Sequence, residues 1–278
     1  MLLEIALGGA RRVSLTFTIL GCGSSGGVPR LGGGWANCDP ANPRNRRRRC
    51  SMLVDWRGPG STAPTRVLID TSPDLREQLL AAEVSRLDGI LMTHPHADHT
   101  NGIDDVRPLV IHNRRRIDIH MDESTSGVLR RAFGYIFQTP PGSLYPALLN
   151  EKRLVALQQC EINGPGGVLR ATPFLLNHGE IDALGFRFGA VAYTPDVKFI
   201  HEASKPMLEG LDLWIIDALR FAPHPSHFSL DDALAQIALF KPRRAILTNL
   251  HNDLDYAQLA ASLPHHITPA YDGMVVEA

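Results

Sequence analysis

Residues 93–102 read THPHADHTNG and place His94, His96, Asp98 and His99 within a single short stretch. His94 and His96 are two residues apart, so on an extended segment their side chains point to the same side. Asp98 and His99 follow as the chain turns, and can face a second point close by. Imidazole and carboxylate groups are common metal ligands, and a chance cluster of this density is improbable. The segment therefore predicts two adjacent metal positions, each with two ligands from one loop.

Two ligands do not hold a metal firmly, so the chain should supply more. The candidates are His178, Asp196 and His251, which stand in LLNHG, YTPD and TNLH, each after an apolar segment. Isolated histidines such as His112 and His201 are interpreted instead as surface or hydrogen-bonded residues.

The elements that must position these side chains alternate between strands and helices. The loop at 29–50, with its run RNRRRRC, is predicted to be irregular. A helix is expected to start at Ser72-Pro73 and run to about Val84, and another from Gly102 until Pro108 intervenes. Ser229 and Asp232 form a capping-box pattern that opens a helix to Phe240. Further helices are predicted at 128–137 and 256–263, and strands at 15–20, 51–56, 65–70, 87–94, 117–122, 168–176, 183–189, 190–194, 211–217 and 243–250.

This order predicts two β-rich halves whose sheets pack together with helices outside, as one domain over residues 1–278. The composition is that of an ordinary soluble protein: 278 residues, 44% hydrophobic, with a formal net charge of −1. Nothing global draws the chain to nucleic acid or to an anionic membrane. The four cysteines contain no CxxC pair and are interpreted as reduced thiols. The N-terminal MLLEIALGGARR does not have the pattern of a signal peptide, so a cytoplasmic location is expected.

The motifs GCGSSGGVP, NPRNRRRRCS, DTSPDLREQ, THPHADHTNGIDD and SHFSLDDAL together resemble the metallo-β-lactamase superfamily. Within it they resemble the phosphodiesterase branch, which includes tRNase Z and phosphoribosyl cyclic phosphodiesterases. The resemblance covers nearly the whole chain. It implies an α/β fold, a four-layer αββα sandwich with a dinuclear site along one edge of its two sheets.

Carried over by position, the resemblance assigns His94, His96 and His178 to one metal. Asp98, His99 and His251 are assigned to the second, and Asp196 bridges both. Asp70 matches a superfamily aspartate that orients the metal ligands without binding a metal itself. The ions are expected to be zinc or manganese, with iron also compatible with these ligands. Two such ions would activate water and neutralise charge on a phosphoryl group.

The same resemblance places His227, in SHFS, near the leaving group. We expect it to act as a general acid, because an imidazole can donate a proton near neutral pH. Asp98 is counted with it among the catalytic residues. Substrate binding is assigned to the basic loop and the glycine-rich turn, with a solvated loop face as the alternative for each arginine. These residues are Arg46, Arg48, Arg49, Ser24 and Ser25.

The expected function is hydrolysis of a small cyclic phosphate or nucleotide-like phosphodiester. The alternatives are a tRNase Z-like nuclease and a non-catalytic, metal-dependent nucleotide sensor. Two departures bear on this. Cys38 stands alone where phosphonate-pathway relatives carry several cysteines for a structural zinc, so none is expected here. No long inserted arm for gripping tRNA is evident either, which counts against long nucleic acid as a partner. No membrane partner is expected, and a homodimer is compatible with the sequence.

Overall fold

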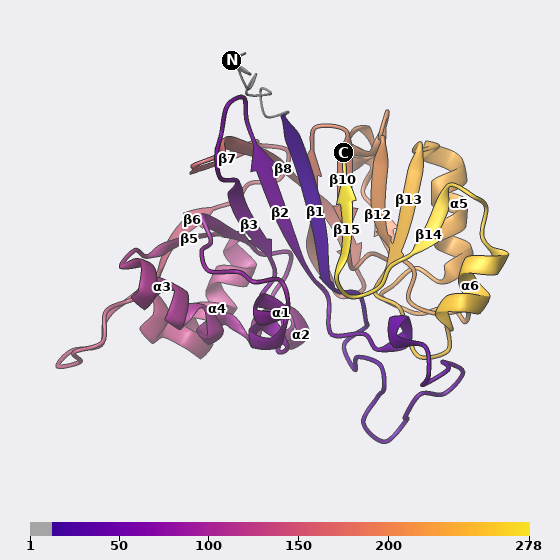
Figure 1. Ribbon diagram of the computed structural model, residues 1–278, viewed down its shortest axis with the longest axis horizontal. Helices are drawn as coiled ribbons and strands as arrows, with labels where there is room; N and C mark the ends of the chain where they lie inside the picture. The colour runs from indigo at the N-terminus through magenta and orange to yellow at the C-terminus, as the bar shows by residue number, and fades with distance from the viewer. Residues whose placement is uncertain (1–12) are drawn as a thin grey trace, which may run out of the picture.

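The computed structural model describes residues 13–278 (Figure 1). The N-terminal MLLEIALGGARR, on which the expectation about a signal peptide depends, lies outside the described residues. Within 13–278, none of the helices combines the length and the apolar character that crossing a membrane requires.

The first sheet has seven strands in the order β15-β1-β2-β3-β4-β5-β6. Strands β15, β1, β2 and β3 pair antiparallel, whereas β3, β4, β5 and β6 pair parallel. Their bounds are β1 Ser14–Gly21, β2 Ser51–Arg57, β3 Thr65–Ile69, β4 Gly89–Leu91, β5 Ile117–Met121, β6 Leu149–Arg153 and β15 Met274–Glu277.

The second sheet runs β11-β8-β9-β10-β12-β13-β14, with β7 added beside β8. Strands β10, β12, β13 and β14 pair parallel. The bounds are β7 Cys160–Gly164, β8 Gly167–His178, β9 Ile181–Phe188, β10 Val191–Thr194, β11 Phe199–Ile200, β12 Leu213–Asp217, β13 Arg244–Thr248 and β14 Ile267–Pro269.

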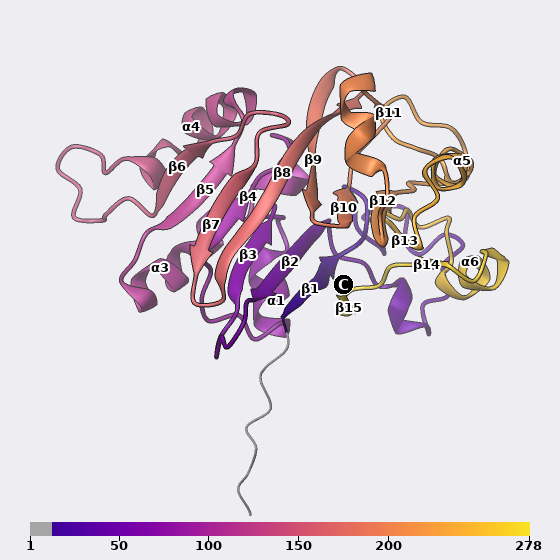
Figure 2. The same ribbon diagram turned by 90° about the horizontal axis from the view of Figure 1, so that it is seen from above.

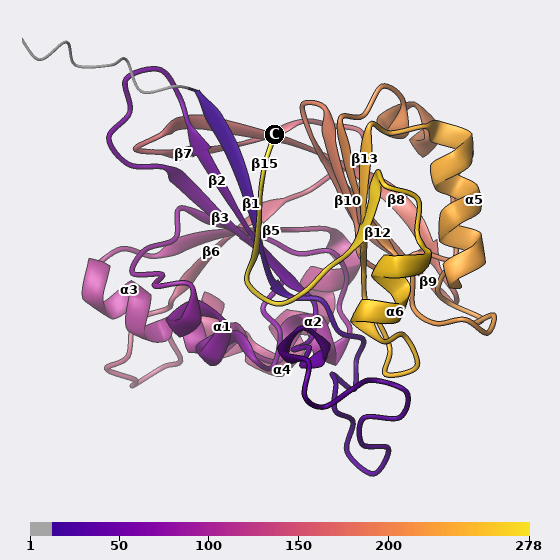
Figure 3. The ribbon, with the colours of Figure 1, turned by 45° about the vertical axis from the view of Figure 1, so that its right-hand side comes forward.

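Helices cover the outer face of each sheet, as two turned views show (Figures 2 and 3). Those on the first sheet are α1 Leu75–Ala81, α2 Ala97–Thr100, α3 Arg107–Asn113 and α4 Glu123–Phe137, and those on the second are α5 Leu230–Phe240 and α6 Tyr256–Ser262. Short 3₁₀ turns lie at η1 Pro43–Asn45, η2 Ile103–Val106 and η3 Glu202–Leu208. The αββα sandwich predicted from the sequence is confirmed.

The layers follow from side-chain alternation along the strands. Phe17 and Ile19 of β1 belong to the core between the two sheets, whereas Leu20 packs in the separate core beneath α1, α3 and α4. Such alternation is what a strand with both faces covered requires. Helix α5 buries Leu230, Ala233 and Ile237 against the second sheet. The capping box of Ser229 and Asp232 is present at its start, as predicted.

Three expectations about helix ends are wrong. Helix α4 starts at Glu123, where Asp122 caps it, and not at residue 128. Helix α1 starts at Leu75 instead of at Ser72-Pro73, because the Ser72 hydroxyl is engaged in a turn: it donates to Gln78 Oε1 at 2.8 Å and accepts from Asp74 N at 3.1 Å. Pro108 does not end a helix but lies in the first turn of α3. Proline is tolerated there because the first N–H groups of a helix have no intrahelical acceptor.

The topology brings the site to one edge of the sandwich. The carboxyl ends of β3 and β4 in the first sheet, and of β10, β12 and β13 in the second, carry the polar segments. Where sheets are parallel, such ends share an edge, which is where α/β proteins place their sites. The two sheets are also tied together there, because Leu184 N donates to Thr93 O at 2.8 Å.

Candidate metal centre

Three histidines from two elements converge at this edge. His94 and His96 follow β4, and His178 ends β8. His96 Nδ1 lies 3.1 Å from His94 Nε2 and 3.2 Å from His178 Nε2. The three possible ligand atoms lie within 4.8 Å of one another. The structure therefore brings together the set predicted to hold the first metal.

In His94, His99 and His178 the ring nitrogen that points away from the cluster, Nδ1, is hydrogen-bonded to the protein. His99 Nδ1 contacts Asp70 Oδ2 at 2.7 Å, and His178 Nδ1 contacts Ser226 O at 2.8 Å. His94 Nδ1 lies 2.9 Å from Thr93 Oγ1, whose own proton goes to Asp70 Oδ2. These acceptors place the proton on each Nδ1 and leave each Nε2 with a lone pair directed into the cluster.

Asp196, just after β10, stands at the centre of the arrangement. Its Oδ2 lies 3.6 Å from His178 Nε2 and 3.9 Å from His94 Nε2, and its Oδ1 lies 3.3 Å from His99 Nε2. One carboxylate thus faces both groups of histidines, which is the position that the family resemblance implies for the bridging ligand. Burial opposes its charge, yet the facing His99 holds the pKa of Asp196 well below its ordinary value.

Asp70 orients the cluster from behind. It follows β3 in a left-handed backbone conformation (φ 61°), which aspartate tolerates better than most residues. Its Oδ1 accepts Thr93 N at 2.8 Å, and its Oδ2 receives both Thr93 Oγ1 and His99 Nδ1. Thr71 N donates to His99 O at 2.8 Å, so the backbone carrying His99 is fixed as well.

These donors fit a divalent metal. The converging Nε2 and Nδ1 lone pairs repel one another unless a cation lies between them, and imidazole with carboxylate is the donor set that zinc, manganese and iron share. The electrostatics agree. Burial opposes the charge on His99, but the carboxylates of Asp196, Asp98 and Asp70 raise its pKa well above the ordinary value, so the field favours a positive charge. His94 is the reverse case: its burial, reinforced by His99, keeps its pKa well below the ordinary value.

The residues predicted for the second metal are less closely assembled. Asp98 Oδ2 lies 3.5 Å from His99 Nε2. His251 lines the same cavity as Asp98, but neither belongs to any group of three ligand-type residues that the structure gathers within 13–278. His251 Nδ1 and Asp253 Oδ1 are buried without a hydrogen bond and lie 3.4 Å apart. The assignment of these ligands remains a prediction.

His227 stands beside the cluster on a carboxylate of its own. Its Nδ1 lies 2.9 Å from Oδ2 of Asp217, the last residue of β12, and 3.1 Å from Asn249 Nδ2. Burial raises the pKa of Asp217 to about 6. Burial acts against protonation of His227, but Asp217 prevails and raises the pKa of His227 to about 9. The imidazole is thus held as a proton carrier 3.9 Å from Asp196 Oδ2.

A cavity of about 190 Å³ opens onto these groups. Asp98, His227 and His251 line it together with Ser24, Ser25 and Arg30 from the glycine-rich segment, and Leu219, Arg220 and His224 complete the lining. The glycine-rich turn adjoins the segment of His251, because Ser24 N contacts Leu250 O at 3.4 Å. The Arg220 guanidinium donates to Ala222 O and Pro223 O, so it is already occupied in holding its own loop.

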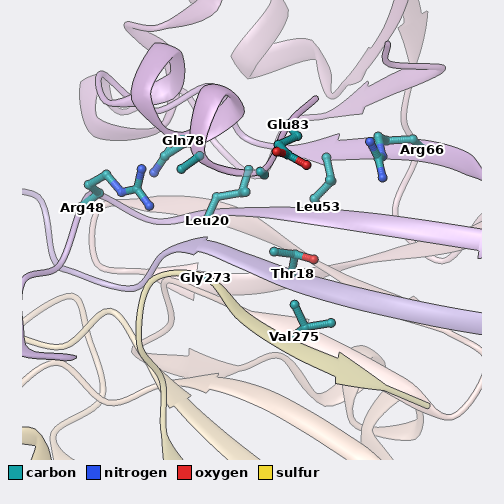
Figure 4. A pocket seen from close by; sticks show the side chains of 11 residues that line it. Thr18, Leu20, Arg48, Leu53, Arg66, Gln78, Glu83, Gly273 and Val275 are labelled. Atoms are coloured by element: carbon teal, nitrogen blue, oxygen red, sulfur yellow. The ribbon is translucent and has the colours of Figure 1, made fainter. Parts of the chain in front are cut away.

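The predicted arginines lie in other places. Arg46, Arg48 and Arg49 line a separate cavity of about 540 Å³ on the far side of the glycine-rich turn. Arg48 pairs with Asp272, and Arg49 with Asp74, both at 3.0 Å. Arg48 also reaches a third cavity of about 250 Å³ on the outer face of the first sheet, beside Gln78 and Leu20 (Figure 4). Their assignment to substrate binding stays a prediction, whereas Ser24 and Ser25 do lie at the cavity of the metal cluster.

Sequence reasoning missed several of the surrounding residues. Asp217 and Asn249 follow apolar strands, as the predicted ligands do, so the same signal could have found them. Arg30, in GVPR, does not follow an apolar strand, so no sequence pattern pointed to it. Its place in the cavity depends on how the loop folds back.

The family and its relatives agree with this geometry. Residues 65–249 match the model of the beta-lactamase superfamily domain. Among solved structures, a diphosphatase from the PhnP family is 36% identical, with a TM-score of 0.82, covering 95% of this chain and 98% of that one. The short form of human tRNase Z is 17% identical, with a TM-score of 0.61, over 94% of this chain and 98% of that one, which shows the shared fold.

A curated relative is much longer. The octanoyltransferase of Porphyromonas gingivalis (strain ATCC BAA-308 / W83) is 31% identical over an alignment of 262 residues, which covers 92% of this chain and 50% of that protein. The chain therefore spans about half the length of this relative.

Proposed function

This chain belongs to the metallo-β-lactamase superfamily of metal-dependent hydrolases, and we propose that it hydrolyses a small phosphodiester or nucleotide-like diphosphate. The observation that carries the proposal is the cavity. It brings the proton carrier His227 beside the predicted metal ligands Asp98 and His251, so a phosphate ester bound there can meet both the metal and the proton donor.

The bound ions would activate water and neutralise charge that develops on a phosphoryl group. The residues of the chain have distinct tasks. Asp70 and Thr93 hold the imidazoles in the orientation that binds metal. His227, kept protonated by Asp217, supplies a proton to the departing oxygen. The small cavity volume favours a substrate of a few groups over a long polymer.

The relationship to the PhnP-family diphosphatase supports this choice, because it spans nearly both chains at 36% identity. The likeness to tRNase Z concerns the fold alone, and the net charge of −1 offers no general attraction to tRNA. The name of the longer octanoyltransferase gives no reason to assign acyl transfer to this half, whose site is built from histidines and carboxylates.

The test is a substrate panel with the purified protein loaded with zinc or manganese. It contains bis-p-nitrophenyl phosphate, a ribose cyclic phosphate, a dinucleoside diphosphate, a lactone and a precursor tRNA. We expect cleavage of the small phosphate compounds only. Cleavage of the lactone or the tRNA in preference to all of them would reject the proposal. Full metal loading with nucleotide binding but no cleavage would identify a sensor instead.

A further inference from the structure

Arg30 is an arginine without a partner at the edge of the cavity. Within residues 13–278 its guanidinium has neither an ion pair nor a hydrogen bond, although the side chain is half-buried. The backbone around it is well fixed: Arg30 N donates to Gly34 O at 2.9 Å, and Gly34 N returns a bond to Arg30 O at 2.8 Å. Its nitrogens are not among the buried unpaired atoms of the described residues, so they stay open to the cavity and can meet an anion there.

The glycine-rich turn positions this guanidinium. A Cβ on Gly26 would lie 2.7 Å from Arg30 Nε and 2.9 Å from its Cζ. The guanidinium therefore packs against Gly26 in the space that any larger residue would fill. The close approach holds it at the cavity wall, whereas an arginine on an open surface would extend into solvent.

A second polar group in the same wall is also unused. The Ser24 hydroxyl is buried and has no hydrogen-bond partner, and the residue is only 3% exposed. Its backbone is fixed, because Ser24 N contacts Leu250 O at 3.4 Å and Ser24 O accepts Gly27 N at 2.7 Å. A buried hydroxyl left unpaired costs stability, and a ligand in the cavity that Ser24 lines can supply the missing partner.

We propose that Arg30 and Ser24 form a second anion subsite, which holds the phosphoryl group that is not attacked when a diphosphate diester is hydrolysed. The inference rests on the proposed function, because the attacked phosphoryl group is taken to lie at the metal cluster. In the reaction, the oxygen of water bonds to one phosphorus, and the bridging P–O bond breaks. The bridging oxygen leaves with the second phosphoryl group, and one proton of the water is transferred to the products, giving two monoesters.

The charges of the cavity fit this assignment. Its one lining carboxylate among the described residues is Asp98, a predicted metal ligand. Of the other lining cations, Arg220 already donates to two carbonyl oxygens, and His227 is paired with Asp217. Arg30 is thus the cation free to meet a second anionic group, and it would discriminate a diphosphate from a simple phosphodiester.

A matched pair of substrates tests the subsite: the p-nitrophenyl esters of adenosine 5′-monophosphate and of adenosine 5′-diphosphate. Arg30→Met should raise KM for the diphosphate ester roughly 10- to 100-fold, the usual range for losing hydrogen bonds to a charged group. KM for the monophosphate ester should change little. Arg131→Met, which removes an exposed arginine of α4 outside the cavity, is the control for net charge.

Two further variants separate binding from folding. Gly26→Ala keeps the charge but displaces the guanidinium, so it should weaken binding of the diphosphate ester selectively. Ser24→Ala should also raise KM for that ester, while its melting temperature stays the same or increases, because an unpaired buried hydroxyl is removed. If Ser24 had only a structural role, Ser24→Ala would lower the melting temperature of the substrate-free protein. The ratio of the KM values for the two esters would then stay unchanged.

Equal losses on the two esters, or no loss on either, would overturn the subsite. Activity of the unaltered protein on the monophosphate ester tests the proposed function separately, since that ester does not need Arg30. If neither ester is cleaved, the proposed function fails, and titration of the metal-loaded protein with AMP and ADP decides the subsite alone. Tighter binding of ADP that disappears in Arg30→Met supports it, and an unchanged ratio rejects it.

Discussion

The metal cluster and the loop beside it are built differently. The strand-end wall, formed by the segments after β3, β4, β8, β10 and β12, carries the cluster and gives its histidines partners behind the ring. Asp70 stands behind His99, Ser226 behind His178, and Asp217 behind His227. The loop wall, residues 22–50, uses most of its polar groups to attach itself to the rest of the fold. It leaves Ser24 and Arg30 unpaired.

This difference separates the part of the site that must be rigid from the part that can select the substrate. A metal centre needs its ligands held within narrow geometry, so their hydrogen-bond partners are part of the site. A substrate subsite is complete only when the substrate supplies the missing partner. On this view the strand-end wall carries the chemistry common to the superfamily, and the loop wall selects the substrate.

The largest effect is expected from removing a central ligand of the strand-end wall. His94→Ala or Asp196→Ala should lower the metal content below the two ions per chain expected for such a site and abolish phosphate-ester cleavage. Metal content is measured by elemental analysis after dialysis. Full content in both variants would show that the cluster is not the metal centre.

His227 should matter for proton transfer and not for metal. His227→Ala should leave metal content unchanged and reduce kcat by ~10²–10⁴-fold on an ester with an alkyl leaving group, the usual value of general acid catalysis. A p-nitrophenyl ester should lose less, because its leaving group needs little protonation. His227→Gln controls for the buried Asp217 left without a partner. Equal losses on both esters would indicate substrate positioning instead.

Changing a residue that orients a metal ligand should lower metal affinity less than removing the ligand itself. Asp70→Asn keeps an acceptor for His99 Nδ1 but removes the charge, so metal affinity should fall by roughly 10- to 100-fold, as for other residues behind metal ligands. Competition with a chromogenic chelator measures this. An unchanged affinity would mean that the backbone bonds of Thr71 suffice to orient His99.

In the loop wall, Arg47 should act on stability. It is 2% exposed, and its guanidinium donates to His251 O at 2.9 Å and Leu254 O at 2.6 Å. Arg47→Met removes both charged hydrogen bonds, leaving His251 O to Leu254 N and Leu254 O to the weak donor Cys38 Sγ, and should lower the free energy of unfolding by about 1–3 kcal/mol. Denaturant titration gives the value. Loss of metal content without loss of stability would reveal that Arg47 mainly positions His251.

The exposed faces of the same loop should give the smallest effects. Arg48 and Arg49 pair with Asp272 and Asp74 in a cavity away from the metal cluster. Arg48→Met and Arg49→Met should each change the free energy of unfolding by about 1 kcal/mol or less, as is usual for partly exposed ion pairs. A selective rise in KM for a nucleotide ester would restore the original assignment of these arginines to substrate binding.

The sequence by itself determined whatever depends on short-range pattern. The alternation of β1 and β2, the capping box of α5 and the crowding of ligands at 94–99 are properties of neighbouring residues, so they could be predicted. The start of α1 could not, because the side chain of Ser72 had two competing uses and the contact with Gln78 decided between them.

Only the tertiary structure decided which members of a run of similar residues do what. Arg47 and Arg49 are two residues apart, yet Arg47 bonds the carbonyl of a residue 204 positions away and Arg49 pairs with Asp74, 25 positions away. Arg30 and Ser24 gained their place at the site in the same way. A side chain's role depends on which distant groups meet it and on how much water is excluded around it, and neither property is encoded in local spacing.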